Sequence, residues 1–477
     1  MSMYESFNCS GEWWFPAHPE RTVMGNLYFD PEKGFKLNLM GSLCPRTNSK
    51  AKQHPAIILG LTKEHGEITL FQCIHNSEPI RVKKMNCDKY HEFSESVFSP
   101  QYILTGAHFL KQEDLQFEKM IIRYTNFDEW VDISGVTLSD FNENNQFDMK
   151  YSSPPDIHVQ LNNECSVSIE FNFQYPSYNF LQKEVICKQE ISLCIEFLDK
   201  TPFKKFMEVI YSFKNFLSFA VNEPVYLKNI IGVTGNPYTS FSNNNLNKKL
   251  IVNLMNEKFC ELLPPKKERL SPNMLFSYPD IAPKFDAILK KWFLNSEKFE
   301  PVFNLYFLTI YNHELVLENQ FLNLIQAIEA YHRRAFTQQI EPDVNHQKKM
   351  NEILTSVPEA YKEWIRKKLE YSNEKYLAIK LSDILKKNPQ MSQLLFIDEK
   401  TRKKFIYEVT NARNIFTHWD PERKPVEFEK LHLYVKKLKL LLGMCILSEF
   451  GFSAEESVKY SEKLFNESEK GILIQFD

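Results

Sequence analysis

The stretch VSIEFNF, residues 167–173, alternates apolar and polar side chains along its whole length. ISLCIEF, residues 191–197, repeats the same period of two. Such alternation places the apolar residues on one face of a strand and the polar residues on the other. The two runs therefore predict antiparallel strands with one buried and one solvated face. The apolar residues of the first run are Val167, Ile169, Phe171 and Phe173.

The residues before this stretch carry the same signal. In GNLYFDPEKGFKLNLMG, residues 25–41, two alternating runs flank the turn-forming sequence Asp-Pro-Glu-Lys-Gly, which predicts a β-hairpin. Residues 1–200 are therefore expected to form a β-rich, antiparallel domain.

The pattern changes at residue 201. Thr201 is suited to cap a helix and Pro202 to occupy its first position, and five apolar residues then follow at helical spacing from Phe203 to Leu217. Two short strands are expected within 222–237 and 248–255. The Pro-containing segment 261–284 is the best candidate for a linker. We expect residues 201–284 to pack on the N-terminal domain.

From residue 285 the chain is predicted to be helical. In ENQFLNLIQAIEAYHRR, residues 318–334, the apolar residues and His332 fall on one stripe. The predicted fold class is α+β in two parts, with an all-α bundle at 285–477 behind the β-rich region. Further helices are expected at about 357–371, 376–387, 398–413 and 426–449.

The composition describes a multidomain chain with no bias towards one class of partner. It has 477 residues and a net charge of −3, so a nucleic-acid partner would need a local basic patch. Its nine Cys are scattered without a C-x-x-C pair, which fits reduced thiols. No apolar run approaches the ~20 residues that span a bilayer, and no signal peptide is recognisable. We expect a cytoplasmic protein that does not interact with a membrane.

The stretch RNIFTHWD, residues 413–420, is the candidate for chemistry. Asn414 and His418 are four residues apart and share a helical face, whereas Arg413 lies about 140° from His418 on an ideal helix. The sequence Asp420-Pro421 predicts that the helix ends near His418, within reach of the long Arg413 side chain. Because chance supplies about 0.3 such Arg–His pairs in a chain of this composition, the interpretation depends on this helical context.

An Arg, an Asn and a His together suit cleavage of RNA by its own 2′-hydroxyl. His418 is suited to move protons, and Arg413 is suited to bind two phosphate oxygens. Asn414 supports them, and its place on the face of His418 is expected to let it orient the imidazole. This chemistry needs no metal or other cofactor. Since one His cannot easily serve as both acid and base, a second residue, or a second copy of the motif in a dimer, would complete the site.

The surrounding sequence is basic. Between residues 400 and 440 there are eleven Lys or Arg against five Asp or Glu, a net charge of +6. Arg402, Lys403 and Lys404 are therefore candidate RNA contacts, although a solvated helix face explains them equally well.

RNIFTHW, together with ENQFLNLIQAIEAYHRR upstream, resembles the ApeA-like branch of the HEPN superfamily of α-helical ribonucleases. That family carries an Arg, a polar residue and, a few positions later, a His, which match Arg413, Asn414 and His418. The N-terminal half resembles the β-rich domain that precedes HEPN in ApeA-like proteins. The matching features are GEWWFP at 11–16, the hairpin at 25–41, a second strand pair in ILGLTKEHGEITLFQC at 58–73, and RYTNFDEWVDISG at 123–135.

The resemblance implies an antiphage ribonuclease that acts by abortive infection. Its HEPN domains would pair as a homodimer with both motifs in one cleft, its substrate would be RNA, with tRNA among the candidates, and a phage-derived trigger would activate it. The N-terminal domain would be a sensor or regulator. Related domains often place polar residues near Glu329 and His332 facing the cleft, although a hydrogen-bonded histidine on an apolar stripe is the simpler interpretation of His332.

Two rival functions remain open. Beside the antiphage ribonuclease, the chain could instead be a non-catalytic HEPN-type module that dimerises and recognises a phage component. The second rival is a HEPN toxin neutralised by a partner. The sequence contains no Gly-rich phosphate loop, G-x-S-x-G or H-E-x-x-H.

One weak metal signal is present. The pairs Cys73-x-His75 and Cys87-x3-His91 place four zinc-compatible side chains within 19 residues, but neither is a standard zinc motif. Isolated thiols and imidazoles are the simpler interpretation, so no metal is predicted.

Overall fold

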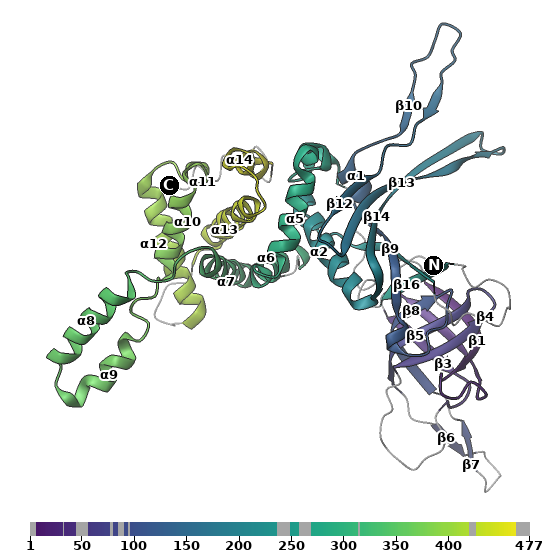
Figure 1. Cartoon of the computed structure of the whole chain (residues 1–477), viewed down its shortest axis with the longest axis horizontal. Helices are drawn as coiled ribbons and strands as arrows, with labels where there is room; N and C mark the ends of the chain where they lie inside the picture. The colour runs from purple at the N-terminus through teal and green to yellow at the C-terminus, as the bar shows by residue number, and fades with distance from the viewer. Residues whose placement is uncertain are drawn as a thin grey trace. The chain divides into compact units, whose positions relative to one another are not determined.

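The computed structural model describes residues 6–31, 33–43, 56–76, 96–235, 249–256, 269–312, 315–418 and 426–463, and the backbone of 80–83 and 90–93. The contacts within the chain divide it into two compact units, Met1–Asp286 and Ala287–Asp477. The first unit is antiparallel and β-rich, and the second is helical (Figure 1). The two-part α+β fold class is confirmed.

Six strands of the first unit close on themselves. They follow the order β8–β3–β2–β1–β4–β5, and β5 pairs back to β8. The predicted hairpin at 25–41 is confirmed as β2 and β3, with Leu27 opposite Leu37 and Phe29 opposite Phe35. The strands are β1 (Phe7–Trp14), β2 (Val23–Asp30), β3 (Gly34–Leu39), β4 (Ile57–Thr62), β5 (Gly66–His75) and β8 (Ser96–Thr105).

Strand β1 packs its Trp13 side chain into this ring. Trp13 is fully buried, and its indole nitrogen donates to the Gly25 carbonyl at 3.2 Å. A Cβ atom at Gly60 of β4 would lie 2.3 Å from the Trp13 ring, so this position needs glycine. Trp13 of GEWWFP thus contributes to the core of the ring, whereas Trp14 is half-buried and packs edge-on against His108.

Six more strands extend the sheet from β8, in the order β16–β15–β9–β14–β13–β12. VSIEFNF lies in β13 and ISLCIEF in β14, and Val167 stands opposite Ile195 in an antiparallel register. The alternation therefore predicted these strands correctly. The strands are β9 (Gln116–Tyr124), β12 (Ile157–Gln160), β13 (Cys165–Asn179), β14 (Glu184–Pro202), β15 (Leu227–Thr234) and β16 (Leu250–Asn256).

Two ribbons project from this part of the sheet (Figure 1). One is the distal part of β13 and β14, and the other is β10 (Val136–Leu138) with β11 (Met149–Tyr151). They meet at their bases, where the Tyr151 and Phe173 rings stack at 3.7 Å. Gln189 joins the two bases by donating to Ile133 O and accepting from Gly135 N. A third short ribbon consists of β6 (Ile80–Lys83) and β7 (Tyr90–Phe93).

Helix α2 (Phe203–Val221) packs against β14 and β9 and buries the five predicted apolar residues. Its predicted start is wrong by one residue. Pro202 still belongs to β14 and precedes the helix, and the Thr201 hydroxyl donates to Asp199 O at 2.9 Å instead of capping it. Thr201 and Pro202 instead pair with β9 as the last residues of β14. The single helical turn α1 (Phe127–Val131) also contacts β14, and a 3-10 turn, η1 (Gln112–Asp114), precedes β9.

Residues 269–284 of the expected linker pack within the first unit, and residues 261–268 lie outside the described part of the chain. Phe276 is buried, and its carbonyl accepts from the indole nitrogen of Trp130 at 3.0 Å. Arg269 pairs with Glu223 at 2.9 Å. The segment contains η2 (Ser271–Asn273), α4 (Tyr278–Ile281) and η3 (Ala282–Lys284).

The second unit is a helical bundle around α13, in which fourteen residues are buried. Both the apolar stripe of α7 and the predicted core residues of α12 are buried. Helix α12 continues past the approximate bound of 413 to His418, where the described part of the helix stops. The helices are α5 (Phe285–Ser296), α6 (Glu300–Tyr311), α7 (Leu317–Ala335), α8 (Asp343–Ser356), α9 (Glu359–Leu369), α10 (Leu377–Lys387), α11 (Pro389–Leu395), α12 (Glu399–His418), α13 (Phe428–Glu449) and α14 (Ala454–Glu462).

Helices α8 and α9 form a hairpin between α7 and α10. Neither helix has a buried residue. The hairpin is joined at its neck by a β-bridge between Gln339 and Glu374, and Ile340 N donates to Asn373 O at 2.8 Å.

Candidate functional site

The Arg–His motif occupies the last turns of α12. Arg413 and Asn414 are half-buried, and His418 is exposed at the end of the described helix. Nη1 of Arg413 donates to Oδ1 of Asn414 at 3.2 Å. The structure thus brings Arg413 and Asn414 together, while no hydrogen bond from either to His418 is present among the described residues.

This hydrogen bond brings the Arg413 guanidinium closer to the face of α12 that carries Asn414 and His418. Five residues of helix turn Arg413 about 140° from His418, so its Cβ points away from the face of Asn414 and His418. The guanidinium nevertheless reaches the Asn414 side chain. Asn414 therefore draws the charged end of Arg413 towards the face that carries His418.

A buried side chain anchors this turn of α12 to the bundle. Phe416 packs edge-on against Phe321 of α7, with ring centroids 5.7 Å apart. Ala412, one turn earlier, is also buried. Because both point inwards, the neighbouring polar positions of the motif are held outwards on a helix that is fixed from beneath.

The face of α12 that carries Asn414 and His418 extends towards the N-terminus of the helix. Lys404, Tyr407, Asn411, Asn414 and His418 follow one another at intervals of three or four residues, which places them on one face. Lys404 is exposed, and Tyr407 exposes 68% of its surface. A cation, an aromatic ring and two amides thus lie in a row that ends at His418.

The three candidate RNA contacts at the start of α12 differ in their surroundings. Lys403 and Arg402 approach the carboxylate of Glu399 at 3.0 and 3.5 Å. Arg402 is mostly buried, with 21% of its side chain exposed. Lys404 is exposed, and the described residues show no ion pair for it. Lys403 and Arg413 are separated by ten residues, or about 15 Å of helix.

His332 lies in a different place from the motif. Its side chain is completely buried, and its Nε2 donates to Oδ2 of Asp383 on α10 at 3.1 Å. Nε2 of Gln338 lies 3.4 Å from the other ring nitrogen, and the ring of Phe336 stacks on the imidazole at 4.6 Å. Both nitrogens of His332 are thus occupied within the fold.

Asp383 is also held by a second cation. Lys375 donates to the same carboxylate oxygen at 2.8 Å. Burial lowers the pKa of His332 below its ordinary value, and the hydrogen bond to Asp383 opposes this shift only in part. Partial burial of Asp383 raises its pKa, but Lys375 and His332 outweigh that effect and hold it below the ordinary value. The cluster therefore favours a neutral imidazole beside an ionised carboxylate.

Glu329 belongs to the same side of α7. It lies 3.7 Å from the ammonium of Lys380, a nearly buried lysine of α10. Glu329 and His332 are eight and eleven residues beyond Phe321, which touches the motif helix. This separation is about 12 and 16 Å along α7. The structure therefore places Glu329 and His332 at the contact between α7 and α10 and shows no contact between them and Arg413 or His418.

The candidate zinc ligands are only partly described. Cys73 is buried in β5, which raises the pKa of its thiol, and His75 stacks on Phe98 with centroids 4.7 Å apart. Cys87 and the side chain of His91 lie outside the described residues. Within the described part, no three His, Cys, Asp or Glu side chains are arranged to hold a metal ion.

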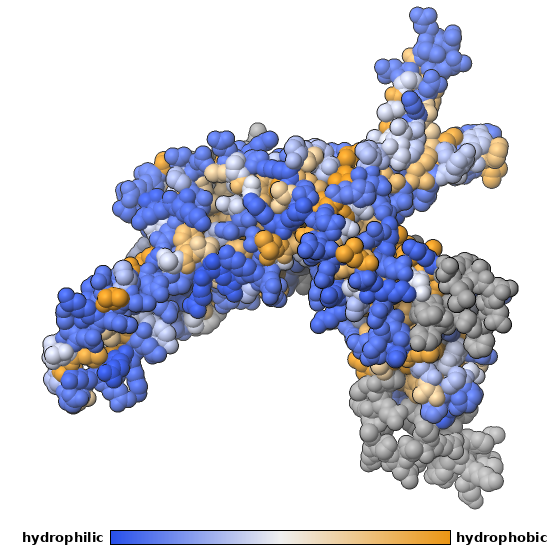
Figure 2. All heavy atoms as spheres, viewed as in Figure 1, coloured by the Kyte–Doolittle hydropathy of each residue, from blue (hydrophilic) through white to orange (hydrophobic). Residues whose placement is uncertain are grey.

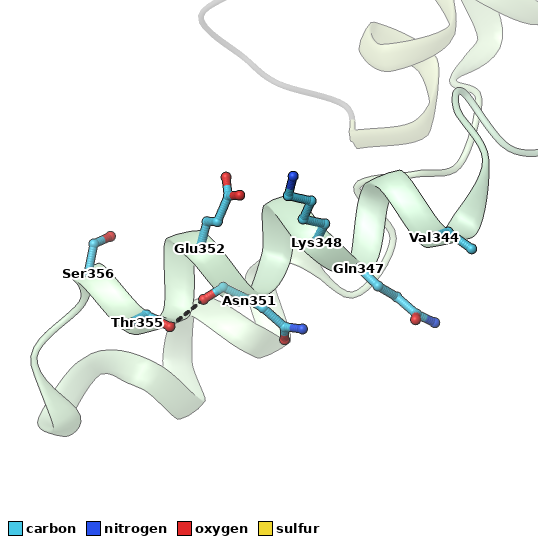
Figure 3. A pocket seen from close by; sticks show the side chains of 7 residues that line it. All are labelled: Val344, Gln347, Lys348, Asn351, Glu352, Thr355 and Ser356. Atoms are coloured by element: carbon cyan, nitrogen blue, oxygen red, sulfur yellow. Dashed lines mark hydrogen bonds between the residues drawn. The ribbon is translucent and has the colours of Figure 1, made fainter.

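A shallow hollow runs along one face of α8 and contains no residue of the motif (Figure 3). Amide and hydroxyl side chains dominate it, and the Thr355 hydroxyl donates to Asn351 O at 2.7 Å. All of its lining residues come from α8, so the hollow is open to solvent and does not enclose a site. The lining residues are Val344, Gln347, Lys348, Asn351, Glu352, Thr355 and Ser356.

Sequence reasoning did not find the partners of His332. Asp383, Lys375 and Gln338 come from α10 and from the segments at the neck of the hairpin, six to 51 residues away in the chain. No regular sequence spacing links these residues to His332, because they are brought together only where the chain folds back at the neck between α7 and α10.

The fold and the site define a β-rich domain followed by a HEPN-type helical domain with an Arg–polar–His motif. Comparison with known families agrees. The model of ApeA N-terminal domain 1 matches residues 8–292, and the model of the Apea-like HEPN domain matches residues 322–456. No curated protein and no solved structure matches the chain significantly. The chain belongs to the ApeA-like HEPN family.

Membership of this family indicates the general class of function and assembly. The two domains fit a family of antiphage effectors, and HEPN domains are typically related to nucleases and commonly dimerise. None of the described helices is long and apolar enough to cross a membrane.

Proposed function

We propose that the chain is a metal-independent endoribonuclease of an abortive-infection system. Infection triggers it, and the N-terminal domain acts as sensor or regulator. The observation that carries the proposal is the motif on α12, in which an exposed His418 follows an Arg413 whose guanidinium is held by Asn414.

The reaction is an internal transesterification. A base takes the proton of the ribose 2′-hydroxyl, the 2′-oxygen attacks the adjacent phosphorus, and the bond from phosphorus to the 5′-oxygen breaks. The leaving oxygen accepts a proton. The products carry a 2′,3′-cyclic phosphate and a 5′-hydroxyl. His418 transfers one of these protons, because it is exposed at the end of α12 where a flexible substrate can reach it.

Arg413 stabilises the crowded phosphorane. Its guanidinium stays charged and presents parallel N–H groups that fit two phosphate oxygens. Asn414 is a positioning residue, since its Oδ1 holds the guanidinium near the face of His418.

A second copy of the motif supplies the other half of the acid and base pair. One His cannot easily perform both transfers in a single site, and the homodimer expected through the HEPN domain brings a second His418 into the cleft. RNA then follows the exposed row of α12. Lys404 and, more weakly, the Glu399-paired Lys403 and Arg402 bind its phosphates, while Tyr407 stacks on a base.

The test compares purified wild type with His418→Ala and Arg413→Ala in RNA cleavage and in protection against phage. His346→Ala on α8 is the matched control, because it removes a histidine outside the motif. We expect both motif variants to stay folded and to lose cleavage and protection. If either folded variant cleaves RNA and blocks phage like the wild type, the proposal fails.

The rival functions give different results. A non-catalytic module that binds a phage component leaves RNA intact, so products with cyclic phosphate ends in the presence of EDTA exclude it. A HEPN toxin neutralised by a partner kills cells when it is expressed alone, whereas an infection-triggered enzyme does not.

A further inference from the structure

The tip of the β13–β14 ribbon exposes an unusual amount of apolar surface. Tyr175, Phe180 and Leu181 are 94%, 74% and 95% exposed. Val185 and Ile186, on the returning strand, are also more than half exposed. Figure 2 shows hydrophobic side chains at the end of this arm. Soluble proteins rarely leave such large side chains together in water.

The ribbon runs beyond its neighbours in the sheet. β12 pairs only as far as Ile169 on β13, and β9 reaches only Leu193 on β14. Beyond its base, no other strand of the described chain flanks the ribbon. An isolated two-stranded ribbon is marginally stable in water, so a partner that covers the tip would also stabilise it.

The charge of the tip limits the kind of partner. Residues 174–186 contain a single positive and a single negative side chain, Lys183 and Glu184, which are adjacent. Without a cluster of cations the tip is poorly suited to RNA. The neighbouring β10–β11 ribbon differs, because residues 139–150 hold three acidic side chains and one lysine.

We propose that the β13–β14 tip is a self-association surface that packs against the same tip of a second copy of this chain. A two-fold interface presents a surface to itself, which suits a nearly uncharged patch and disfavours an acidic one. The three tip aromatics, Tyr175, Tyr178 and Phe180, expose on the order of 400 Å², and the aliphatic neighbours add a similar area. These side chains lie on both faces of the ribbon, since Tyr178 pairs with Val185 and Ser177 with Ile186. One interface therefore covers about half of this area, less than the ~800 Å² that each partner buries in a standard interface, so the contact is a weak one.

Side-chain packing, and not the pairing of strand edges, forms this contact. Pro176 has no backbone N–H to donate, and the register of β13 with β14 shifts between Gln174 and Ser177. Both features interrupt the edge of β13, and irregular edges of this kind hinder pairing with a further strand. The exposed faces of the aromatic side chains remain available.

The test measures the molar mass of the full chain by light scattering and sedimentation over roughly 1–100 µM, where weak dimers dissociate. The probe variant is Phe180→Asp, and the matched control is Phe141→Asp, at the tip of the other ribbon, where Phe141 is 69% exposed. Both positions are exposed, so we expect neither change to alter the circular dichroism spectrum or the melting temperature.

We expect wild type and Phe141→Asp to reach at least twice the mass of Phe180→Asp at the highest concentration. A dimer formed through the HEPN domain would persist in all three proteins and leave this ratio intact. Equal masses for wild type and Phe180→Asp overturn the inference and point to a foreign protein as the occupant of the tip. An equal decrease in molar mass in Phe180→Asp and Phe141→Asp, relative to wild type, also overturns the inference, because it indicates nonspecific association. The measurement does not read RNA cleavage, so its failure is distinct from failure of the proposed function.

Discussion

Two histidines of the helical unit, His418 and His332, occupy opposite environments. His418 is exposed at the end of α12, and the described residues give it no hydrogen bond. His332 is fully buried on α7, with Asp383, Gln338 and Phe336 around its ring. The difference separates a group available for proton transfer from one that maintains the contact between α7 and α10. Both residues carry the same side chain, so the surroundings decide the role.

The largest effect is expected at the exposed histidine. His418→Gln removes proton transfer, and we expect the rate of RNA cleavage to fall about 10²–10⁴-fold with no change in melting temperature. His332→Gln, measured beside it, should retain the cleavage rate per folded molecule. The comparison breaks if His332→Gln loses as much cleavage per folded molecule as His418→Gln does.

The buried histidine should dominate stability. His332→Ala removes a hydrogen bond to an ionised partner and leaves a cavity, and we expect the free energy of unfolding to fall by roughly 2–3 kcal/mol. Urea denaturation measures it, with His418→Ala as the control. Equal stability of His332→Ala and wild type would show that the cluster does not support the bundle.

A smaller effect on cleavage is expected at Asn414, which accepts the hydrogen bond from Arg413. Asn414→Ala frees the guanidinium of Arg413, and we expect cleavage to fall about tenfold, in kcat more than in KM, because substrate positioning in the transition state is lost. Asn414→Asp retains an oxygen acceptor for Arg413 and should restore most of the rate. If both variants behave alike, the hydrogen bond from Arg413 has no part in the reaction.

The smallest effect concerns pH. The folded protein lowers the pKa of His332, so the unfolded chain binds a proton more readily as the pH falls through about 6.5. The free energy of unfolding should therefore decrease on acidification below that pH. In His332→Gln this part of the pH dependence should be absent. A parallel pH profile in the two proteins would assign the acid sensitivity to other groups.

Local sequence patterns predicted much of the fold. The alternation in VSIEFNF and ISLCIEF gave the strands β13 and β14, and the stripe from Phe321 to His332 gave the buried face of α7. These elements have one buried face, which sets a clear period. Helix α6 is apolar on most sides, so it has no readable period, and it was missed as a separate helix. Helix α8 was missed as well, whereas α9, which also buries no residue, was predicted at 357–371.

The candidate site was predictable only in part. The spacing from Arg413 to His418 identified the motif, but the hydrogen bond from Arg413 to Asn414 depends on a side-chain rotamer that no spacing encodes. The partners of His332 come from segments joined through the neck of the hairpin. Contacts of this kind require the tertiary structure.

The central claim is that His418 transfers a proton during RNA cleavage. The most direct measurement is sequencing of RNA 5′ ends from phage-infected cells that carry either wild type or His418→Ala. The account predicts new 5′-hydroxyl ends at defined positions with wild type, and none of them with His418→Ala. The same ends in both cell populations, or new ends that carry a 5′-phosphate, would contradict it.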